Sequence, residues 1–74
     1  MTEERLSSVA KVIEIVGVSN ESWEDAAKNA VKEASKTIEN ITGVEIDSYT
    51  GNVRNGEVKE FKAVVKIAFG LTNR

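Results

Sequence analysis

Carboxylates are the residues of this chain best suited to chemistry, because their oxygens are the ligands that divalent cations prefer. The chain has 12 Asp and Glu residues among 74. Glu14, Glu45 and Glu57 are far apart in the sequence, so they would form a cation site only if assembly around a rotation axis gathered them. The sequence therefore leaves a cation site open and assigns no set of metal ligands.

The sequence predicts no catalytic residue. It contains no Cys and no His, which removes the thiolate and the commonest general base. Residues 47–51 begin like a calcium loop but lack the acidic residues and the closing Glu that this loop requires. No nucleophile–base pair and no Gly-rich phosphate loop is present, so the chain is not expected to be an enzyme.

Charge and length narrow the classes of partner. The formal net charge is −2, with Lys and Arg balanced against Asp and Glu, which gives no electrostatic basis for nucleic-acid or membrane partners. The apolar runs are too short to span a membrane and no signal peptide is recognisable, so we expect a cytoplasmic protein. A single domain of this size without disulfides or a metal often gains buried area by forming oligomers.

The elements that must position any site are three strands and a helix. Residues 58–71 give the clearest pattern, because apolar side chains recur at every second position over residues 61–71 and predict a strand with one buried face. Residues 9–18 predict a first strand, and residues 44–53 a second with a bend at Gly51. Asn55 and Gly56 predict a tight type I′ hairpin turn.

Between the first two strands, an Ala-rich stripe with spacings of three and four predicts an amphipathic helix. Its members are Trp23, Ala26, Ala27, Ala30, Val31, Ala34, Ile38 and Ile41. Ser22 is expected to cap the helix, with Asp25 as its capping-box partner. Gly43 lies just past the stripe, where a left-handed residue often ends a helix.

These elements predict an α+β fold of order β-α-β-β, with a three-stranded antiparallel sheet in strand order 1-3-2 and the helix on one face. Residues 1–8 are expected to be a flexible N-terminus, residues 9–71 the single domain and residues 72–74 a tail. The first and second strands are open edges, which soluble proteins seldom leave uncovered. We therefore predict a homo-oligomer.

Two single residues and one lysine stripe have alternative interpretations. Trp23 is expected to be a core or interface residue, with a stacking platform for a ligand as the alternative. Lys62 is expected to be solvated or ion-paired, with a phosphate or carboxylate ligand as the alternative. Lys28, Lys32 and Lys36 are expected to form a solvated helix face rather than a nucleic-acid contact, because Glu24 and Glu33 lie beside them.

Several segments of the chain resemble the dodecin family. Residues 12–19 resemble the first strand and turn of the dodecins, and residues 22–27 resemble the start of their helix. From residue 43 onward, Glu45, Gly56, Phe61, the segment 66–69 and Leu71 fall at the spacing of that family without a gap. The resemblance covers residues 9–71.

The resemblance implies a β-α-β-β protein whose twelve copies form a hollow sphere. In the flavin-binding dodecins, the isoalloxazine ring stacks on a Trp that opens the second strand, and a Gln early in the third strand hydrogen-bonds the ring. Gly43 and Lys62 occupy these two positions here, and Thr50 and Gly70 stand where many bacterial members have Arg. The chain is thus similar to a branch without the stacking Trp, and Gly43, Lys62 and Glu45 are its candidate ligand-binding residues.

Three functions remain open at this point. The resemblance implies a homododecamer that stores a flavin (FMN, riboflavin or FAD), with binding weakened or altered by Gly43 and Lys62. The alternative is a shell that binds no flavin and has a structural role or binds divalent cations. A small adaptor that uses its exposed sheet to bind protein or nucleic acid is the third.

Overall fold

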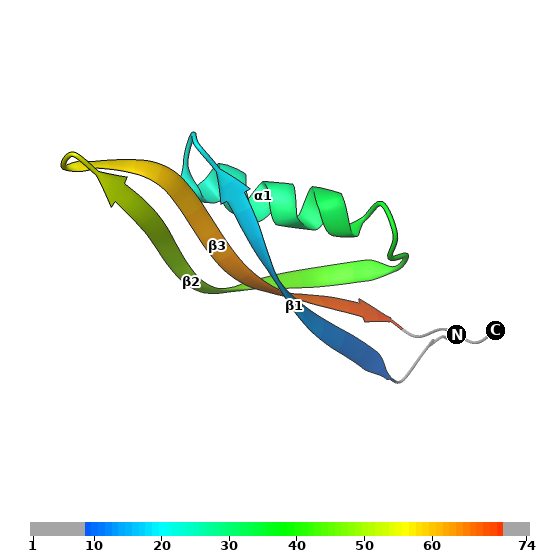
Figure 1. Cartoon of the computed structure of the whole chain (residues 1–74). Coiled ribbons are helices and arrows are strands. Elements are labelled where there is room, and N and C mark those ends of the chain that lie inside the picture. The colour runs from blue at the N-terminus through cyan, green and yellow to red at the C-terminus, as the bar shows by residue number, and fades with distance from the viewer. Residues whose placement is uncertain (1–8, 71–74) are drawn as a thin grey trace.

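The computed structural model describes residues 9–70. The elements are strand β1 (Ala10–Ser19), helix α1 (Trp23–Ala34), strand β2 (Ile41–Arg54) and strand β3 (Glu57–Gly70). The strands form one antiparallel sheet in the order β1-β3-β2, and α1 lies across one face of it (Figure 1). The predicted β-α-β-β order and 1-3-2 topology are confirmed. The predictions for residues 1–8, Leu71 and residues 72–74 fall outside the described residues.

The core forms where α1 packs on the middle of the sheet. Alternate residues of β3 face the helix, and three of them are fully buried: Ala63, Val65 and Ile67. The buried residues of the helix are all Ala, namely Ala26, Ala30 and Ala34, while Val31 packs beside them and is partly buried. Small side chains let the helix backbone approach the sheet closely.

The approach is closest at Gly17 in β1. A Cβ atom there would overlap the carbonyl oxygen of Ala26 and would lie 2.9 Å from the Ala30 side chain. Only glycine fits between strand and helix at this point, because both groups it would meet are held in the core. Gly17 therefore sets the distance between β1 and α1.

Of the two hydrogen bonds predicted for the capping box at the start of the helix, the structure has one. The Ser22 side chain caps α1 by accepting a hydrogen bond from the Asp25 backbone N–H at 3.0 Å. The second half of the capping box differs, because Asp25 Oδ2 accepts instead from the Ser19 hydroxyl at 2.7 Å. Ser19 is buried, and its hydroxyl oxygen also accepts from the Glu21 backbone N–H at 2.8 Å. This network ties the end of β1 to the first turn of α1.

The helix is shorter than its apolar stripe, so the prediction that Gly43 ends it is wrong. The helix ends at Ala34, with Ser35 as C-cap, and the chain reverses at Asn40, which takes the left-handed conformation at φ 66°. Gly43 instead lies inside β2, opposite Ala68. The tertiary reason is that Ile41 pairs with Phe69, and strand pairing overrides helical periodicity there.

The hairpin between β2 and β3 matches the prediction at its turn and differs along its length. Asn55 and Gly56 both have positive φ, at 55° and 78°, as a type I′ turn requires. The irregularity predicted at Gly51 is not found there, since Gly51 pairs in register with Phe61. The nearest shift in strand register lies between Asn52 and Val53. A Cβ atom at Gly51 would lie 2.8 Å from the Glu60 carbonyl oxygen, so glycine serves close approach there rather than a bulge.

The helix covers β1 and β3 and scarcely touches β2. The molecule is elongated, with extents of 56 × 20 × 16 Å, and its core is small for the length of its strands. Many large apolar side chains therefore stay exposed. They are Val9, Val12, Val16, Val18, Val44, Ile46, Tyr49, Val53 and Val58. Isolated exposed residues need no explanation, but rows of them along two strands indicate interaction surfaces.

The face assignment predicts that Val65→Asp prevents folding, because Val65 is fully buried and a carboxylate there would have no partner. The cost is several kcal/mol, about the whole stability of a small domain. The matched control Lys28→Ala, on the exposed helix face, should change stability by less than about 0.5 kcal/mol. Thermal melts followed by circular dichroism measure both, and a wild-type melt for Val65→Asp would refute the assignment.

Candidate functional site

The three candidate ligand-binding residues lie on the face of the sheet that α1 leaves open. Gly43 is opposite Ala68, and Lys62 is opposite Thr50, all on the side away from the buried residues of β3. Gly43 lies beside Ala68, which is six residues from Lys62 along β3. At about 3.4 Å per residue, Gly43 and Lys62 are therefore about 20 Å apart. A single copy therefore does not bring Gly43 and Lys62 together around one small ligand.

Gly43 lies in an open environment. A Cβ atom built there meets nothing within 4 Å, and its φ is outside the left-handed range. The position therefore accepts a Cβ atom without overlap or backbone strain. As glycine, it presents only bare backbone to a ligand.

Lys62 is paired rather than free. Its ammonium lies 3.9 Å from Glu60 Oε1, and the two side chains are 37% and 41% exposed. Val18 of β1 and Thr50 of β2 are its cross-strand neighbours, so no carboxylate lies directly opposite it. A long, half-exposed ion pair is weak, and Lys62 remains able to turn toward an anionic group. This pair agrees with the expectation of a solvated or ion-paired Lys62, and its role toward a ligand stays a prediction.

Glu45 belongs to a charged rung that crosses all three strands. Lys66 of β3 lies opposite Glu14 of β1 and opposite Glu45 of β2. Opposite charges on directly paired strands attract, so Lys66 balances the two carboxylates. The sequence singled out Glu14 and Glu45 as carboxylates that assembly could gather. It did not predict that both lie opposite one Lys, because this depends on strand register.

The third carboxylate, Glu57, is not part of this rung. It lies beside the hairpin turn, where Lys59 Nζ donates to its Oε1 at 2.8 Å. Within residues 9–70, no three acidic, His or Cys side chains are placed to hold a metal ion together. Any cation site built from Glu14, Glu45 and Glu57 therefore needs carboxylates from more than one copy.

Trp23 packs against residues of its own chain. Its ring meets Phe61 edge-on, with centroids 4.7 Å apart, and is tilted toward Tyr49 at 6.0 Å. The indole N–H donates to the Thr50 carbonyl at 2.7 Å. These contacts support the interpretation of Trp23 as a structural residue. The indole hydrogen bond joins residues 27 positions apart and left no signal in the sequence.

The predicted lysine stripe is solvated, as expected, although Lys36 lies beyond the end of α1 at Ala34. Lys28, Lys32 and Lys36 are all exposed, and Lys36 pairs with Glu33 at 3.2 Å. A mixed, exposed charge pattern of this kind is typical of a surface helix. The described helix is neither long enough nor apolar enough to cross a membrane.

The match to a family model decides the identity of the fold, because the model named Dodecin matches residues 9–72, nearly the whole chain. The chain belongs to the dodecin family. A dodecin of Thermus thermophilus is 32% identical over 66 residues, covering 89% of this chain and 96% of its own length.

Solved structures give the same result for the fold. The Thermus thermophilus protein tt0972 superposes with a TM-score of 0.84 at 32% identity, covering 89% of this chain and 97% of its own. Dodecins from Streptomyces coelicolor and Streptomyces davaonensis superpose with TM-scores of 0.84 and 0.83 at 29% and 28% identity. They cover 89% and 88% of this chain, and 94% and 96% of their own chains. The resemblance stated from the sequence is thereby confirmed, while the roles of Gly43, Lys62 and Glu45 remain predictions.

The Trp23 hydrogen bond predicts a measurable loss on Trp23→Phe, because the Thr50 carbonyl loses its donor and part of the ring packing disappears. The free energy of unfolding should fall by about 1 kcal/mol or more. Tyr49→Phe is the control, since it keeps the aromatic contact and removes only a hydroxyl. Urea unfolding at equal protein concentration, followed by circular dichroism, compares them. Equal losses in the two variants would contradict a specific role of the indole N–H.

Proposed function

We propose that this dodecin is a cytoplasmic, homo-oligomeric binding and storage protein for flavin-type ligands, most simply a shell of twelve copies, with weak or altered flavin binding. The observation that carries the proposal is the family match over residues 9–72. Exposed apolar residues along β1 and β2 support assembly, since a chain with this small a core gains most of its remaining burial from other copies.

The arrangement of the open sheet face favours a site that copies share. Gly43 and Lys62 are separated by about 20 Å within one sheet, so both can touch one ligand only if a second sheet supplies one of them. An open sheet face has no walls of its own. A facing copy would supply a wall and exclude water, which a planar ligand needs for tight binding.

Weak flavin binding follows from the residues at the two positions. Gly43 offers no aromatic ring, and a lost stack costs about 1 kcal/mol beyond the area buried. Lys62 has three donors and no acceptor, so it cannot accept from a ring N–H as Gln can.

The Glu14–Lys66–Glu45 rung favours a second candidate, a shell without flavin that has a structural role or binds divalent cations. Two carboxylates share one Lys on an exposed face, so each copy keeps one surplus negative charge at this rung. Copies related by symmetry would bring such rungs together. A large colourless particle that binds Mg²⁺ or Ca²⁺ in titration calorimetry, and loses this binding on Glu45→Gln, would favour this candidate.

The proposal predicts a closed homo-oligomer in solution, because two edge strands and their apolar residues cannot all be covered within one copy. Native mass spectrometry should give a single large species with twelve chains. A visible absorption spectrum of the same sample reports any bound flavin. A stable monomer at micromolar concentration would overturn the proposal.

The two ligand positions predict a gain of function. The double variant Gly43→Trp with Lys62→Gln should quench riboflavin fluorescence at concentrations at least tenfold lower than wild type, because Trp restores a stacking surface and Gln restores an acceptor. A Cβ atom at Gly43 meets nothing within 4 Å, so the backbone does not oppose the substitution. Gly43→Leu with Lys62→Gln is the control, since Leu is large and apolar without a ring to stack. Tight quenching by wild type, or equal quenching by the two double variants, would place the pocket elsewhere.

A further inference from the structure

Asn55 and Gly56 form the tip of the β2–β3 hairpin, and this tip projects past the start of α1 (Figure 1). Residues 51–59 are all exposed. The pairing of β1 with β3 ends where Ser19 meets Phe61, so the part of the hairpin beyond Phe61 pairs only with itself. Neither the helix nor β1 therefore holds the tip in place.

The tip is also separated from the rest of the hairpin by an irregularity. The strand register shifts between Asn52 and Val53, and such a shift disrupts the ladder of backbone hydrogen bonds. Beyond it only two pairs remain, Val53 with Val58 and Arg54 with Glu57. The buried core lies outside this segment. Opening of the tip thus breaks few contacts and leaves the core intact, as in other local openings of a native protein.

We propose that Asn55 is a site of spontaneous covalent modification, deamidation through a cyclic imide. The Gly56 backbone nitrogen loses its proton to hydroxide and attacks the side-chain carbonyl carbon of Asn55. The bond from this carbon to the amide nitrogen breaks, and the nitrogen leaves as ammonia with a proton taken from water. Water then opens either carbonyl of the ring and gives aspartate or isoaspartate. The net reaction consumes water, releases ammonia and involves no oxidation or reduction.

The surroundings of Asn55 and Gly56 favour the attack. Gly56 has no Cβ atom to shield its nitrogen, and the space that a Cβ would take is open, with nothing within 4 Å. The backbone hydrogen bond of such a turn joins its first and last residues, Arg54 and Glu57, and leaves the Gly56 N–H unbound. Among residues 9–70, no hydrogen bond holds the Asn55 side chain. Ring closure needs a ψ that the type I′ turn lacks, so the reaction proceeds from the open tip.

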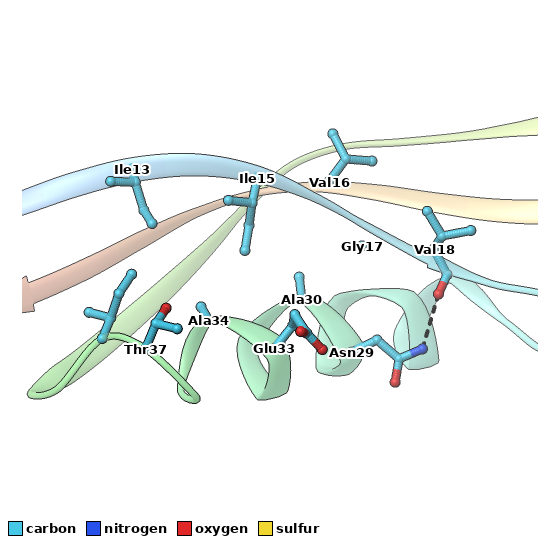
Figure 2. A pocket seen from close by; sticks show the side chains of 11 residues that line it. Ile13, Ile15, Val16, Gly17, Val18, Asn29, Ala30, Glu33, Ala34 and Thr37 are labelled. Carbon is cyan, nitrogen blue, oxygen red and sulfur yellow. Dashed lines mark hydrogen bonds between the residues drawn. The ribbon is translucent and has the colours of Figure 1, made fainter.

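Two other asparagines have side chains that are already bound. Asn52 donates to Glu60 Oε1 at 2.6 Å, and the β-branched Val53 that follows it crowds the attacking nitrogen. Asn29 lies inside α1 and donates to the Val18 carbonyl at 3.0 Å (Figure 2). Asn52 is as exposed as Asn55 and lies in the same hairpin, so it serves as an internal control.

The attacking nitrogen is blocked at two further asparagines. Asn20 precedes Glu21, whose backbone N–H donates to Ser19 Oγ at 2.8 Å. Asn40 has a positive φ like Asn55, but it precedes Ile41, which is β-branched. A left-handed conformation alone therefore does not mark the site. The chain has a single Asn-Gly pair, and the structure places it where the nitrogen and the side chain are both unbound.

The modification would change the turn itself. Isoaspartate routes the backbone through the former side-chain carbon, and a type I′ turn has no place for an additional backbone atom between its two central residues. Either product also adds a carboxylate next to Glu57 on a chain whose net charge is −2. The effect should stay at the hairpin tip, because the core does not contact it. The inference goes beyond the proposed function, since it depends on neither a ligand nor the number of copies.

The test is incubation of the native wild-type protein in mildly alkaline buffer. Cleavage after Glu then gives one peptide, residues 46–57, that contains both Asn52 and Asn55. Fragmentation mass spectrometry measures the conversion of each, and isoaspartyl methyltransferase labels the isoaspartate. Asn55 should convert at least about tenfold faster than Asn52, because glycine leaves the following nitrogen unshielded. The rate should rise with pH, since a base must remove the backbone proton.

Asn55→Gly is the matched variant, because a Gly-Gly pair also forms type I′ turns and has no amide to lose. It should accumulate no acidic form on ion exchange while wild type does. Conversion of wild type in urea but not in the native state would show that the folded turn protects Asn55, and would overturn the inference. Equal conversion of Asn52 and Asn55, or an acidic form of Asn55→Gly that accumulates as fast as that of wild type, would also overturn it.

Discussion

The close packing of an Ala-lined helix on β1 and β3 is the constraint on which the rest of the structure depends. Gly17 allows the helix backbone to come against β1, and Ala26 and Ala30 occupy the gap. A helix this close to two strands cannot also cover the third. The same packing that builds the core therefore leaves β2 bare on its helix side, with Val44 and Ile46 exposed.

This division gives each face of the sheet a separate physical role. The helix side holds the buried residues that stabilise the copy, and its uncovered part provides apolar area for association. The opposite side carries charged residues such as Lys62 and Lys66 together with exposed valines of β1, such as Val12 and Val16, and has no covering layer within one copy. This side of the sheet therefore offers a ligand no walls within one copy.

Much of the fold could be predicted because it follows from local periodicity. The period of two in β3, the Ser22 cap and the Asn55-Gly56 turn each reflect interactions within a few residues, and all three appear in the structure. The end of the helix could not be predicted in the same way. Asn40, rather than Gly43, takes the left-handed conformation, because pairing of β2 with β3 begins at Ile41.

The contacts of the candidate site were the hardest to predict, since they join distant parts of the chain. The rung of Glu14, Lys66 and Glu45 exists only in the observed register, and a shift of one residue would place these side chains on the other face. The hydrogen bond from Trp23 to Thr50 likewise depends on where the helix start meets the edge of β2. The order of residue types along the chain does not say which distant residues come into contact, so it predicts neither the charged rung nor this hydrogen bond.

The positions that hold the fold and the positions proposed for the ligand are physically independent. A side chain at Gly43 would meet nothing within 4 Å, and Lys62 makes only a long, half-exposed ion pair. Replacing either residue therefore changes the open face while the buried contacts of Val65 and Ala30 stay intact. The fold of a single copy therefore depends little on the residues at these two positions.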